Sequence, residues 1–548
     1  MKKHLFGILL IILWFCITSL PGESQTFNWS NQIGGLADDG AKSGCCDKQG
    51  NFYIAGSFGS LECYFQKDTL FRNGFNDMFL AKYDPDGNEI WVSRFGGNNN
   101  SGFENMYVYY DKITDHIFIS GNYYGTADFG SYVLTSVGGF DIFLVKCDLY
   151  GNCVWATSIG SSGVDYSNII SFDTIGNIYM AGTTSGTANF GTYSIPAGGF
   201  LAKFDPEGKC LWAKKKFTWI PIYNSKIFIG GMKIWKTDII LGGCAEVNDT
   251  IRIDTLVVGH KGMLSSMILC LDSTGTVKWI KEGVSGTTES YSDIGIDNDG
   301  NVYQTGNFHD SIDFDGNVIK APGSHEMFLV KYDKTGKFLW ARNSLSNGAY
   351  AEGFGLTINN DGNVFATGYY TGNTFFGDFY IHSNGLYCMF LAGYDSLGNC
   401  QGVYHFWNGY GTGLTHDADG NLFLSALLSG NATLGSKTYN TYGGCDLLIA
   451  KCSEITGIEE PAQDISNRLS IYANPNTGRC NITIPDEFLN EKKLTLQVFD
   501  LQGKLIQQAP IEIIQGKIKL NIEAQAKGTY TAILSNGKKN YTGKIIFK

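Results

Sequence analysis

The sequence predicts an all-β protein: a seven-bladed β-propeller closed by its own N-terminal strand and followed by a small C-terminal β-sandwich. Three observations lead to this prediction. A pattern that is fullest at residues 79–91 recurs along the chain, and its full copies end in tryptophan. The last copy stops halfway, at residues 447–452, and its missing tryptophan half stands near the N-terminus at residues 27–29. The chain also contains 70 glycines and 14% aromatic residues, which is typical of a turn-rich β protein of more than one domain.

Each copy of the pattern predicts a β-hairpin. In residues 79–91 an apolar run precedes Asp84, and Gly87 follows at the turn. An Asp that bonds its own backbone, ahead of a Gly free to take positive φ, favours a tight turn, and the flanking aromatic and β-branched residues favour strand. The tryptophans have a mean spacing of (407 − 29)/6 = 63 residues, and each is expected to be substantially buried between neighbouring sheets. They are Trp29, Trp91, Trp155, Trp212, Trp279, Trp340 and Trp407.

Two further markers complete a repeat unit. After each tryptophan comes a turn and an apolar strand ending in glycine, as at residues 50–56 and 300–306, and then a short segment centred on Phe-Gly, as at 127–130. Four strands per unit predict a radial stack of four-stranded blades. Because the period exceeds the ~40–50 residues of familiar blade repeats, the extra residues are expected in loops.

The split last copy predicts ring closure. An unpaired edge on the last blade would be a template for aggregation, and pairing residues 27–30 with residues 447–451 removes it. An open solenoid is the alternative. It is disfavoured because solenoids end in caps rather than in complementary half-repeats.

The repeat resembles the SBBP family of bacterial β-propeller repeats. That pattern runs from a Trp strand through Gly-Gly and an Asp-rich turn with Gly-Asn to Asp-x-Phe-Leu-x-Lys-Tyr-Asp. Here Trp91 followed by Gly96-Gly97, and the segment 141–146 (DIFLVK), match it. The resemblance covers about residues 26–452. It implies a propeller fold and no shared chemistry, because such folds carry many functions.

Residues 1–24 have the features of a secretory signal peptide. Lys2 and Lys3 precede an apolar run over residues 5–20, and residues 22–24 (GES) offer a small-x-small cleavage site. The run is too short for a comfortable membrane span, and there is no other long apolar stretch. Cys16 lies inside the apolar run, which is not the position expected of a lipoprotein cysteine. The mature chain is therefore expected to begin at Gln25, to be exported, and to contain no transmembrane span.

The sequence changes character after Cys452. Residues 453–466 are interpreted as a linker, and residues 467–548 as a module without the repeat. That module carries twelve Lys and Arg against six Asp and Glu, a net charge of +6, so the remainder carries −11 − 6 = −17. Strand-like runs at 494–499, 511–514, 517–522, 530–534 and 544–547 predict a small antiparallel sandwich. The composition break predicts few contacts between the module and the propeller of residues 25–452.

The C-terminal module resembles the type A sorting domain of the type IX secretion system. The likeness lies in residues 469–478 (LSIYANPNTG), 498–504 (VFDLQGK), 528–530 and 544–546, with Ala473 where the family usually has Pro. It implies export across both membranes, the type IX machinery as a partner, and a secreted or cell-surface, outer-membrane-associated product. An ordinary fibronectin-like domain is the alternative. The sorting-motif residues are Tyr472, Asn474, Pro475, Gly478, Asp500, Gly503, Gly528, Tyr530 and Lys544.

Composition excludes one class of partner and leaves the cysteines open. The acidic balance argues against nucleic acid, which binds basic surfaces. Removing Cys16 leaves 13 cysteines, an odd number. Cys147 and Cys153 flank one turn and could be bridged, but Cys153, Cys210 and Cys400 occupy equivalent positions, which favours core filling.

No motif assigns a catalytic, metal-binding or ligand-binding residue, and no cofactor is expected. The Asp-x-Asp-Gly-Asn runs at 84, 297 and 417 lack the Glu at position twelve of a calcium loop. Residues 333–340 resemble the tryptophan-docking repeat of quinoprotein propellers and the Asp-box of sialidase propellers, with altered spacing. The eight histidines show no close ligand spacing, and no Gly-x-Ser-x-Gly elbow occurs.

The sequence therefore predicts an exported propeller that acts as a binding or structural scaffold for an unknown protein or glycan ligand. Loops on one face of such a scaffold supply the recognition surface. The alternative is an extracellular propeller enzyme of quinoprotein or glycosidase type, which convergent carboxylates or a bound quinone would favour.

Overall fold

The computed structural model shows an all-β protein whose described residues contain no α-helix and one short 3-10 turn at Asp486–Phe488. The signal-peptide interpretation falls on residues outside the described part. The structure describes residues 27–547 except 98–100, 218–225, 248–250, 254–255, 259–262, 286–292, 322–323, 347–348, 384–386, 453–456, 459–468, 473–476, 490, 492, 501–503, 511–516 and 537–538.

The repeats fold into four-stranded antiparallel units, numbered here 1 to 7. Unit 1 contains β2 (Asp39–Cys46), β3 (Phe52–Phe58), β6 (Asp77–Tyr83) and β7 (Glu89–Gly97). Unit 2 contains β8 (Gly102–Asp111), β9 (His116–Tyr124), β12 (Asp141–Cys147) and β13 (Cys153–Ile159). Unit 3 contains β14 (Tyr166–Phe172), β15 (Ile178–Thr184), β18 (Gly198–Phe204) and β19 (Cys210–Phe217). Unit 4 contains β20 (Lys226–Trp235), β21 (Asp238–Val247), β24 (Met263–Leu271) and β25 (Val277–Ser285).

The remaining units repeat this order. Unit 5 contains β26 (Asp293–Ile296), β27 (Val302–Phe308), β30 (Glu326–Tyr332) and β31 (Phe338–Ser346). Unit 6 contains β32 (Ala351–Ile358), β33 (Val364–Tyr370), β36 (Cys388–Tyr394) and β37 (Cys400–Trp407). Unit 7 contains β38 (Gly409–His416), β39 (Leu422–Leu428), β42 (Asp446–Cys452) and, as its outer strand, β1 (Phe27–Ile33).

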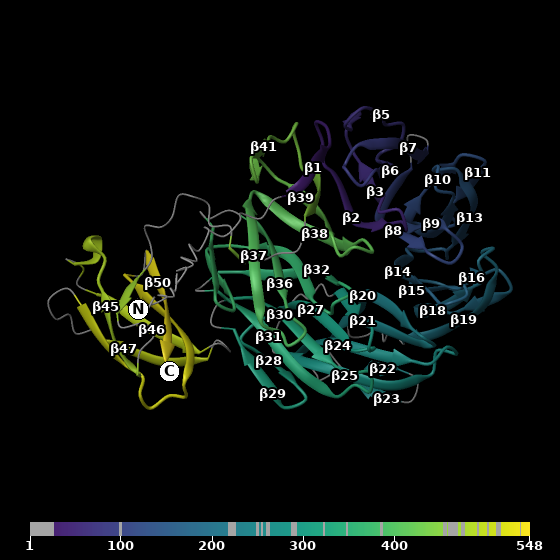
Figure 1. Cartoon of the computed structure of the whole chain (residues 1–548). Helices are drawn as coiled ribbons and strands as arrows, with labels where there is room; N and C mark the ends of the chain where they lie inside the picture. The colour runs from purple at the N-terminus through teal and green to yellow at the C-terminus, as the bar shows by residue number, and fades with distance from the viewer. Residues whose placement is uncertain are drawn as a thin grey trace, which may run out of the picture.

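The N-terminal strand pairs where the split copy predicts. β1 runs antiparallel to β42, with Trp29 opposite Lys451 and Ile33 opposite Leu447. The first strand of each unit contacts the first strand of the next, and β38 of unit 7 contacts β2 of unit 1. Figure 1 shows the units following one another in chain order, with the purple β1 close to the green β39.

The core lies between the faces of neighbouring units. The third strands β12, β30, β36 and β42 are buried along their whole length, as expected for strands covered on both faces. One buried cluster joins Tyr53 and Leu80 of unit 1 to Ile119 and Val145 of unit 2. Each unit is therefore stabilised mainly by apolar burial against its neighbours.

The extra residues of each repeat form a second hairpin, so their predicted placement in loops is wrong. In several units this hairpin pairs with the outer strand of the preceding unit, as β10 does with β7 and β34 with β31. The pairing covers an edge that would otherwise expose backbone donors and acceptors. The hairpins are β4 (Glu62–Tyr64) with β5 (Thr69–Phe71), β10 (Thr126–Phe129) with β11 (Tyr132–Thr135), β16 (Ala188–Phe190) with β17 (Tyr193–Ile195), β22 (Ile251–Ile253) with β23 (Leu256–Val258), β28 (Ser311–Phe314) with β29 (Asn317–Lys320), β34 (Asn373–Phe376) with β35 (Phe379–His382), and β40 (Ala432–Leu434) with β41 (Lys437–Tyr439).

The C-terminal module consists of two sheets around one core. One sheet has the order β44 (Ser470–Tyr472), β45 (Arg479–Thr483), β48 (Lys517–Asn521); the other has β47 (Leu505–Pro510), β46 (Thr495–Asp500), β49 (Gly528–Ser535), β50 (Asn540–Phe547). Val498, Ile482, Leu534 and Ile545 are fully buried between them. Four predicted strands are present: 494–499 corresponds to β46, 517–522 to β48, 530–534 to β49 and 544–547 to β50. The predicted strand at 511–514 lies outside the described residues. The sequence did not predict β44, β45 or β47.

Candidate functional site

In several units the repeated tryptophan joins the unit to the turn of the next one. Trp155 Nε1 of unit 2 donates to the Pro206 carbonyl of unit 3 at 3.3 Å, and Lys146 Nζ donates to the same oxygen at 3.1 Å. Trp340 and Lys331 likewise share the Ser396 carbonyl, and Trp29 and Lys451 share that of Pro85. These groups are thus occupied in architectural contacts between units.

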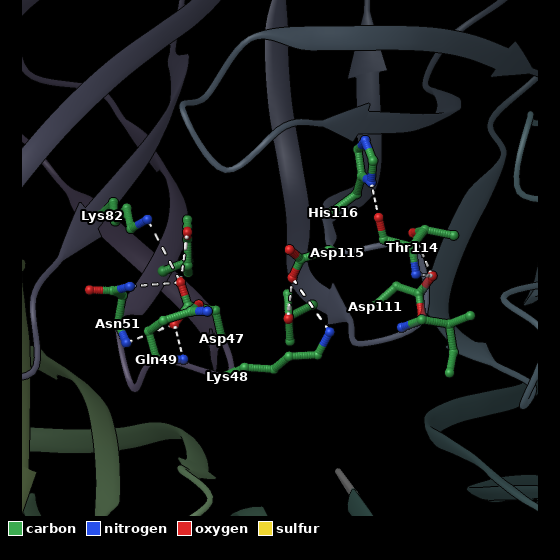
Figure 2. Close-up of polar contacts among 12 residues, drawn as sticks. Asp47, Lys48, Gln49, Asn51, Lys82, Asp111, Thr114, Asp115 and His116 are labelled. Atoms are coloured by element: carbon green, nitrogen blue, oxygen red, sulfur yellow. Dashed lines mark hydrogen bonds and ion pairs between the residues drawn. The ribbon is translucent and has the colours of Figure 1, made fainter.

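The repeated lysine also connects two strands of its own unit. Lys82 Nζ lies 3.7 Å from Asp47 Oδ2 and 4.9 Å from the centre of the Tyr53 ring, and Lys331 stands in the same relation to Asp297. Figure 2 shows Lys82 above the Asp47 turn, whose carboxylate accepts bonds from Gln49 N and Asn51 N. Burial opposes ionisation of Asp297, but bonds from Asn301 and Tyr303 and the charge of Lys331 hold its pKa below the usual value.

The repeated tryptophans are less buried than predicted. None of the seven is fully buried: six are of intermediate exposure, and Trp407 is 37% exposed. Trp407 is also not the equivalent of the others. In unit 6 the positions of the repeated Lys and Trp are taken by Gly393 and Gly402, which pair with each other as Lys82 and Trp91 do. The reason is geometric. The outer strand of unit 7 is β1 from the N-terminus, so no turn joins it to the third strand β42, and a tryptophan of unit 6 would have no such turn to contact.

A β-bulge recurs near the start of several inner strands. The extra residue is Lys42 in β2, Phe354 in β32 and Thr412 in β38, and in β8 the irregularity spans Asn105. Asn105 has a positive φ of 52°. Bulges turn a side chain out of the ladder and are common beside binding sites. The face of units 1–7 on which these bulges lie, opposite the Asp-Gly turns, is called the bulge face.

A cluster of tyrosines lies on the bulge face where units 6 and 7 meet. The ring centres of Tyr369 and Tyr387 are 5.1 Å apart, and each lies 5.2–5.4 Å from that of Tyr410. Burial raises the pKa of Tyr369, and the charge of Glu352 and a hydrogen bond to it raise that pKa further. Tyr387 is 48% exposed. The cluster therefore presents aromatic rings and phenol groups to solvent beside a carboxylate.

A second polar cluster lies on the bulge face across units 1 to 3. Lys42 Nζ donates to Asn105 Oδ1 at 2.6 Å and lies 5.9 Å from the ring centre of Tyr107. Burial lowers the pKa of Lys42, and the negative charge of Glu104 opposes that shift. Burial also raises the pKa of Tyr166, and Glu104 adds to it. Glu104 thus stands beside a tyrosine of the next unit, whereas Glu352 stands beside Tyr369 of its own unit.

Ionisable side chains deeper in the inner strands are held by backbone and neighbouring groups. Asp293 Oδ2 accepts from Leu356 N at 3.0 Å, linking units 5 and 6, and burial raises its pKa against the opposing charge of Lys233. Thr357 Oγ1 and His416 Nδ1 are 2.8 Å apart and link units 6 and 7. Burial lowers the pKa of His416, and Lys233 lowers it further. These contacts join neighbouring units and place acidic and basic side chains close to one another between them.

The predicted sorting residues lie in and between the strands of the C-terminal module. Gly478 has a φ of +94°, and its carbonyl accepts from Ile522 N at 2.7 Å. Asp500 ends β46 and accepts from Lys504 N at 2.9 Å, while Tyr530 in β49 is buried and donates to the Ala526 carbonyl. Tyr472 lies in β44, Gly528 begins β49 and Lys544 lies in β50. Asn474, Pro475 and Gly503 fall outside the described residues.

The cysteines from Cys45 onward are free thiols, including Cys147 and Cys153, which stand opposite each other in the ladder. Burial raises the pKa of Cys153 to about 12, so the thiol stays protonated at neutral pH. Over the described ranges, no three His, Cys, Asp or Glu side chains are placed to hold a metal. Within those same ranges no helix is long and apolar enough to cross a membrane.

Comparisons with known proteins identify the C-terminal module. The family described as secretion system C-terminal sorting domain matches residues 470–548. This domain indicates export to the cell surface or secretion by the type IX system. An uncharacterised WD repeat-containing protein of Acanthamoeba polyphaga mimivirus is 22% identical over 371 residues, which are 53% of this chain and 26% of that protein. The chain thus spans about a quarter of that relative.

The solved structures to which this chain is similar are distant. The Dos1 propeller has a TM-score of 0.37 at 11% identity, covering 79% of this chain and 98% of its own. A Trypanosoma rangeli sialidase has a TM-score of 0.33 at 8% identity, covering 84% and 86%. At TM-scores this low they carry no functional information about this chain.

Proposed function

We propose that the mature protein is a closed seven-bladed propeller, residues 25–452, carried to the cell surface by the module of residues 467–548, where it acts as a binding scaffold. Units 1 to 7 are the blades. Support for closure comes from β1, which pairs with β42, and from Thr412 of unit 7, which donates to the Ala41 carbonyl of unit 1 at 2.9 Å. A signal peptide at 1–24 and a linker at 453–466 complete the proposed organisation.

The observation that carries the binding role is the tyrosine cluster of the bulge face. The face with the Asp-Gly turns uses its repeated Lys, Asp and Trp side chains in contacts within and between units, whereas Tyr387 extends from the bulge face into solvent. Tyrosine combines a large apolar ring with a polar tip and loses little side-chain entropy on binding. A rigid scaffold that exposes such residues suits recognition of a protein or glycan.

A binding screen on the purified protein tests this proposal. Glycan arrays and extracellular protein extracts are presented to the wild type and to Tyr387→Ala, with Tyr150→Ala as the matched control. Tyr150 is 80% exposed and lies in an Asp-Gly turn, on the opposite face. We expect a ligand whose affinity falls at least about tenfold in Tyr387→Ala, the loss of ~1.4 kcal/mol, and is unchanged in Tyr150→Ala. Equal affinity in both variants would contradict binding at this face, and turnover of a bound glycan would identify an enzyme instead.

A further inference from the structure

We propose that the C-terminal sorting module docks on the propeller, at an apolar patch formed where the outer strand of unit 5 meets the second hairpin of unit 6. The composition break in the sequence predicts few contacts between the two parts. Instead, Phe499 and Ile533 of the module form one buried cluster with Phe375 of the propeller, and Leu345 and Tyr380 pack around it.

On the module, strand alternation turns Phe499 and Ile533 away from the module's own core. In β46 the core side chains are Leu496 and Val498, and in β49 they are Ala532 and Leu534. Successive side chains of a strand point to opposite faces, so Phe499 and Ile533 belong to the outer face. They are nevertheless only 8% and 6% exposed. An isolated module would leave both side chains in water.

On the propeller, a matching row of apolar residues crosses three strands. Leu345 of β31 pairs with Phe375 of β34, and Phe375 pairs with Tyr380 of β35. The rings of Phe375 and Tyr380 are 5.1 Å apart. The next residue, Phe376, points into the core of unit 6, so Phe375 faces outward. Its exposure is 6% because the module covers it.

The linker provides a second, independent observation. After leaving unit 7 the chain forms β43 (Gly457–Ile458), which pairs in parallel with β37 at Gly402 and Val403 of unit 6. This is the position at which unit 6 has glycine in place of the repeated tryptophan. The described part of the linker therefore lies at the outer strand of unit 6, the unit whose second hairpin forms part of the patch.

Docking has a consequence for recognition of the module. Phe499 belongs to the segment 498–504, which carries part of the likeness to sorting domains. A partner that contacts this outer face of β46 and β49 has to displace the propeller first. The patch of Leu345, Phe375 and Tyr380 in turn becomes exposed when the module leaves.

Cleavage of the full-length protein in the linker tests the proposal. Glu-C protease cuts after Glu459, directly beyond β43. A charge placed in the contact separates the two parts and frees the linker, so Phe375→Asp and Ile533→Asp should each be cut at least about tenfold faster than wild type, because cutting follows the population of the open form. Phe71→Asp and Leu505→Asp are matched controls at residues 61% and 42% exposed, and both should be cut at the wild-type rate.

The pair of variants separates docking from misfolding. Ile533→Asp could unfold the module, but Phe375→Asp alters the propeller and leaves the module's sequence intact. If both accelerate cutting while the controls do not, and circular dichroism remains native, docking is supported. If Phe375→Asp is cut at the wild-type rate, the module is not held by this patch and the proposal is wrong, whatever Ile533→Asp does.

Discussion

Trp29 Nε1 donates to the Pro85 carbonyl at 3.0 Å, although 56 residues separate the two in the sequence. The bond connects β1, which completes unit 7, to the turn of unit 1. The adjacent Gly87 lies so close to the indole that a Cβ at this position would overlap the Trp29 ring. The N-terminal strand thus contributes both an edge strand to one unit and an anchor to the next.

Gly87→Ala should destabilise the protein more than an alanine at any turn glycine that faces solvent. Gly87 has a φ of +81°, which costs an L-residue about 1 kcal/mol, and the added methyl group would also displace the Trp29 indole. Gly130 has a φ of +75°, and a methyl group there would have no atom within 4 Å, so Gly130→Ala isolates the backbone cost. Denaturant unfolding should show Gly87→Ala to be less stable than Gly130→Ala by at least ~1 kcal/mol. Equal losses of unfolding free energy in the two variants would mean that the Trp29 indole can shift without an energetic cost.

Trp155→Ala should reduce the free energy of unfolding by about 2–4 kcal/mol. The variant loses a half-buried indole, its bond to the Pro206 carbonyl, and its packing on Gly208. Trp407→Ala is the natural control, because Trp407 occupies a different register and is 37% exposed. It should cost less than about 1 kcal/mol. Similar losses at both positions would contradict a special role for the repeated tryptophan.

His405 should make the protein less stable in mild acid. Burial lowers the pKa of His405 to about 4, and its Nδ1 lies 2.5 Å from the Tyr370 hydroxyl. An unfolded His titrates near pH 6.5, so between about pH 6.5 and 4 the unfolded chain binds a proton that the folded one does not. Stability present above pH 6.5 is therefore lost as the pH falls through that window, by up to ~3 kcal/mol.

The matched variant for this prediction is His405→Gln, which cannot titrate. Denaturation midpoints measured at intervals from pH 7 to 4 should fall more steeply for the wild type than for His405→Gln. Parallel profiles would show that another group governs the acid sensitivity of unit 6.

Truncation before Gly528 should trap the protein inside the outer membrane of a bacterium with a type IX system. It removes β49 and β50, half of the four-stranded sheet, and with them the buried Tyr530, Leu534 and Ile545. So small a core does not tolerate that loss. Surface labelling of intact cells reports the outcome.

Two point variants refine the truncation experiment. Leu534→Asp places a charge in the core of the module and should also reduce labelling, whereas Leu505→Asp alters an exposed position and should not. Undiminished labelling of the truncated protein would mean that the module is only another extracellular domain.

Features that depend on local pattern could be predicted without the structure. The Asp-Gly turns, the hairpins and the all-β class follow from turn chemistry and strand propensity within a few residues, and the half-repeats at the two ends were enough to predict that β1 pairs with β42. The C-terminal motifs likewise indicated export, which the match over residues 470–548 supports.

Features that depend on neighbours distant in the chain could not be predicted in this way. In the sequence Trp407 looks like the other repeated tryptophans, but the strand register places Gly402 at their position. Unit 7 takes its outer strand from the N-terminus, so it has no turn that a tryptophan of unit 6 could contact. The tyrosine cluster is assembled from β33, β38 and the residue before β36, and no spacing in the sequence reveals it. The burial of Phe499 against Phe375 depends on two outer faces meeting, and strand alternation shows only that each faces outward.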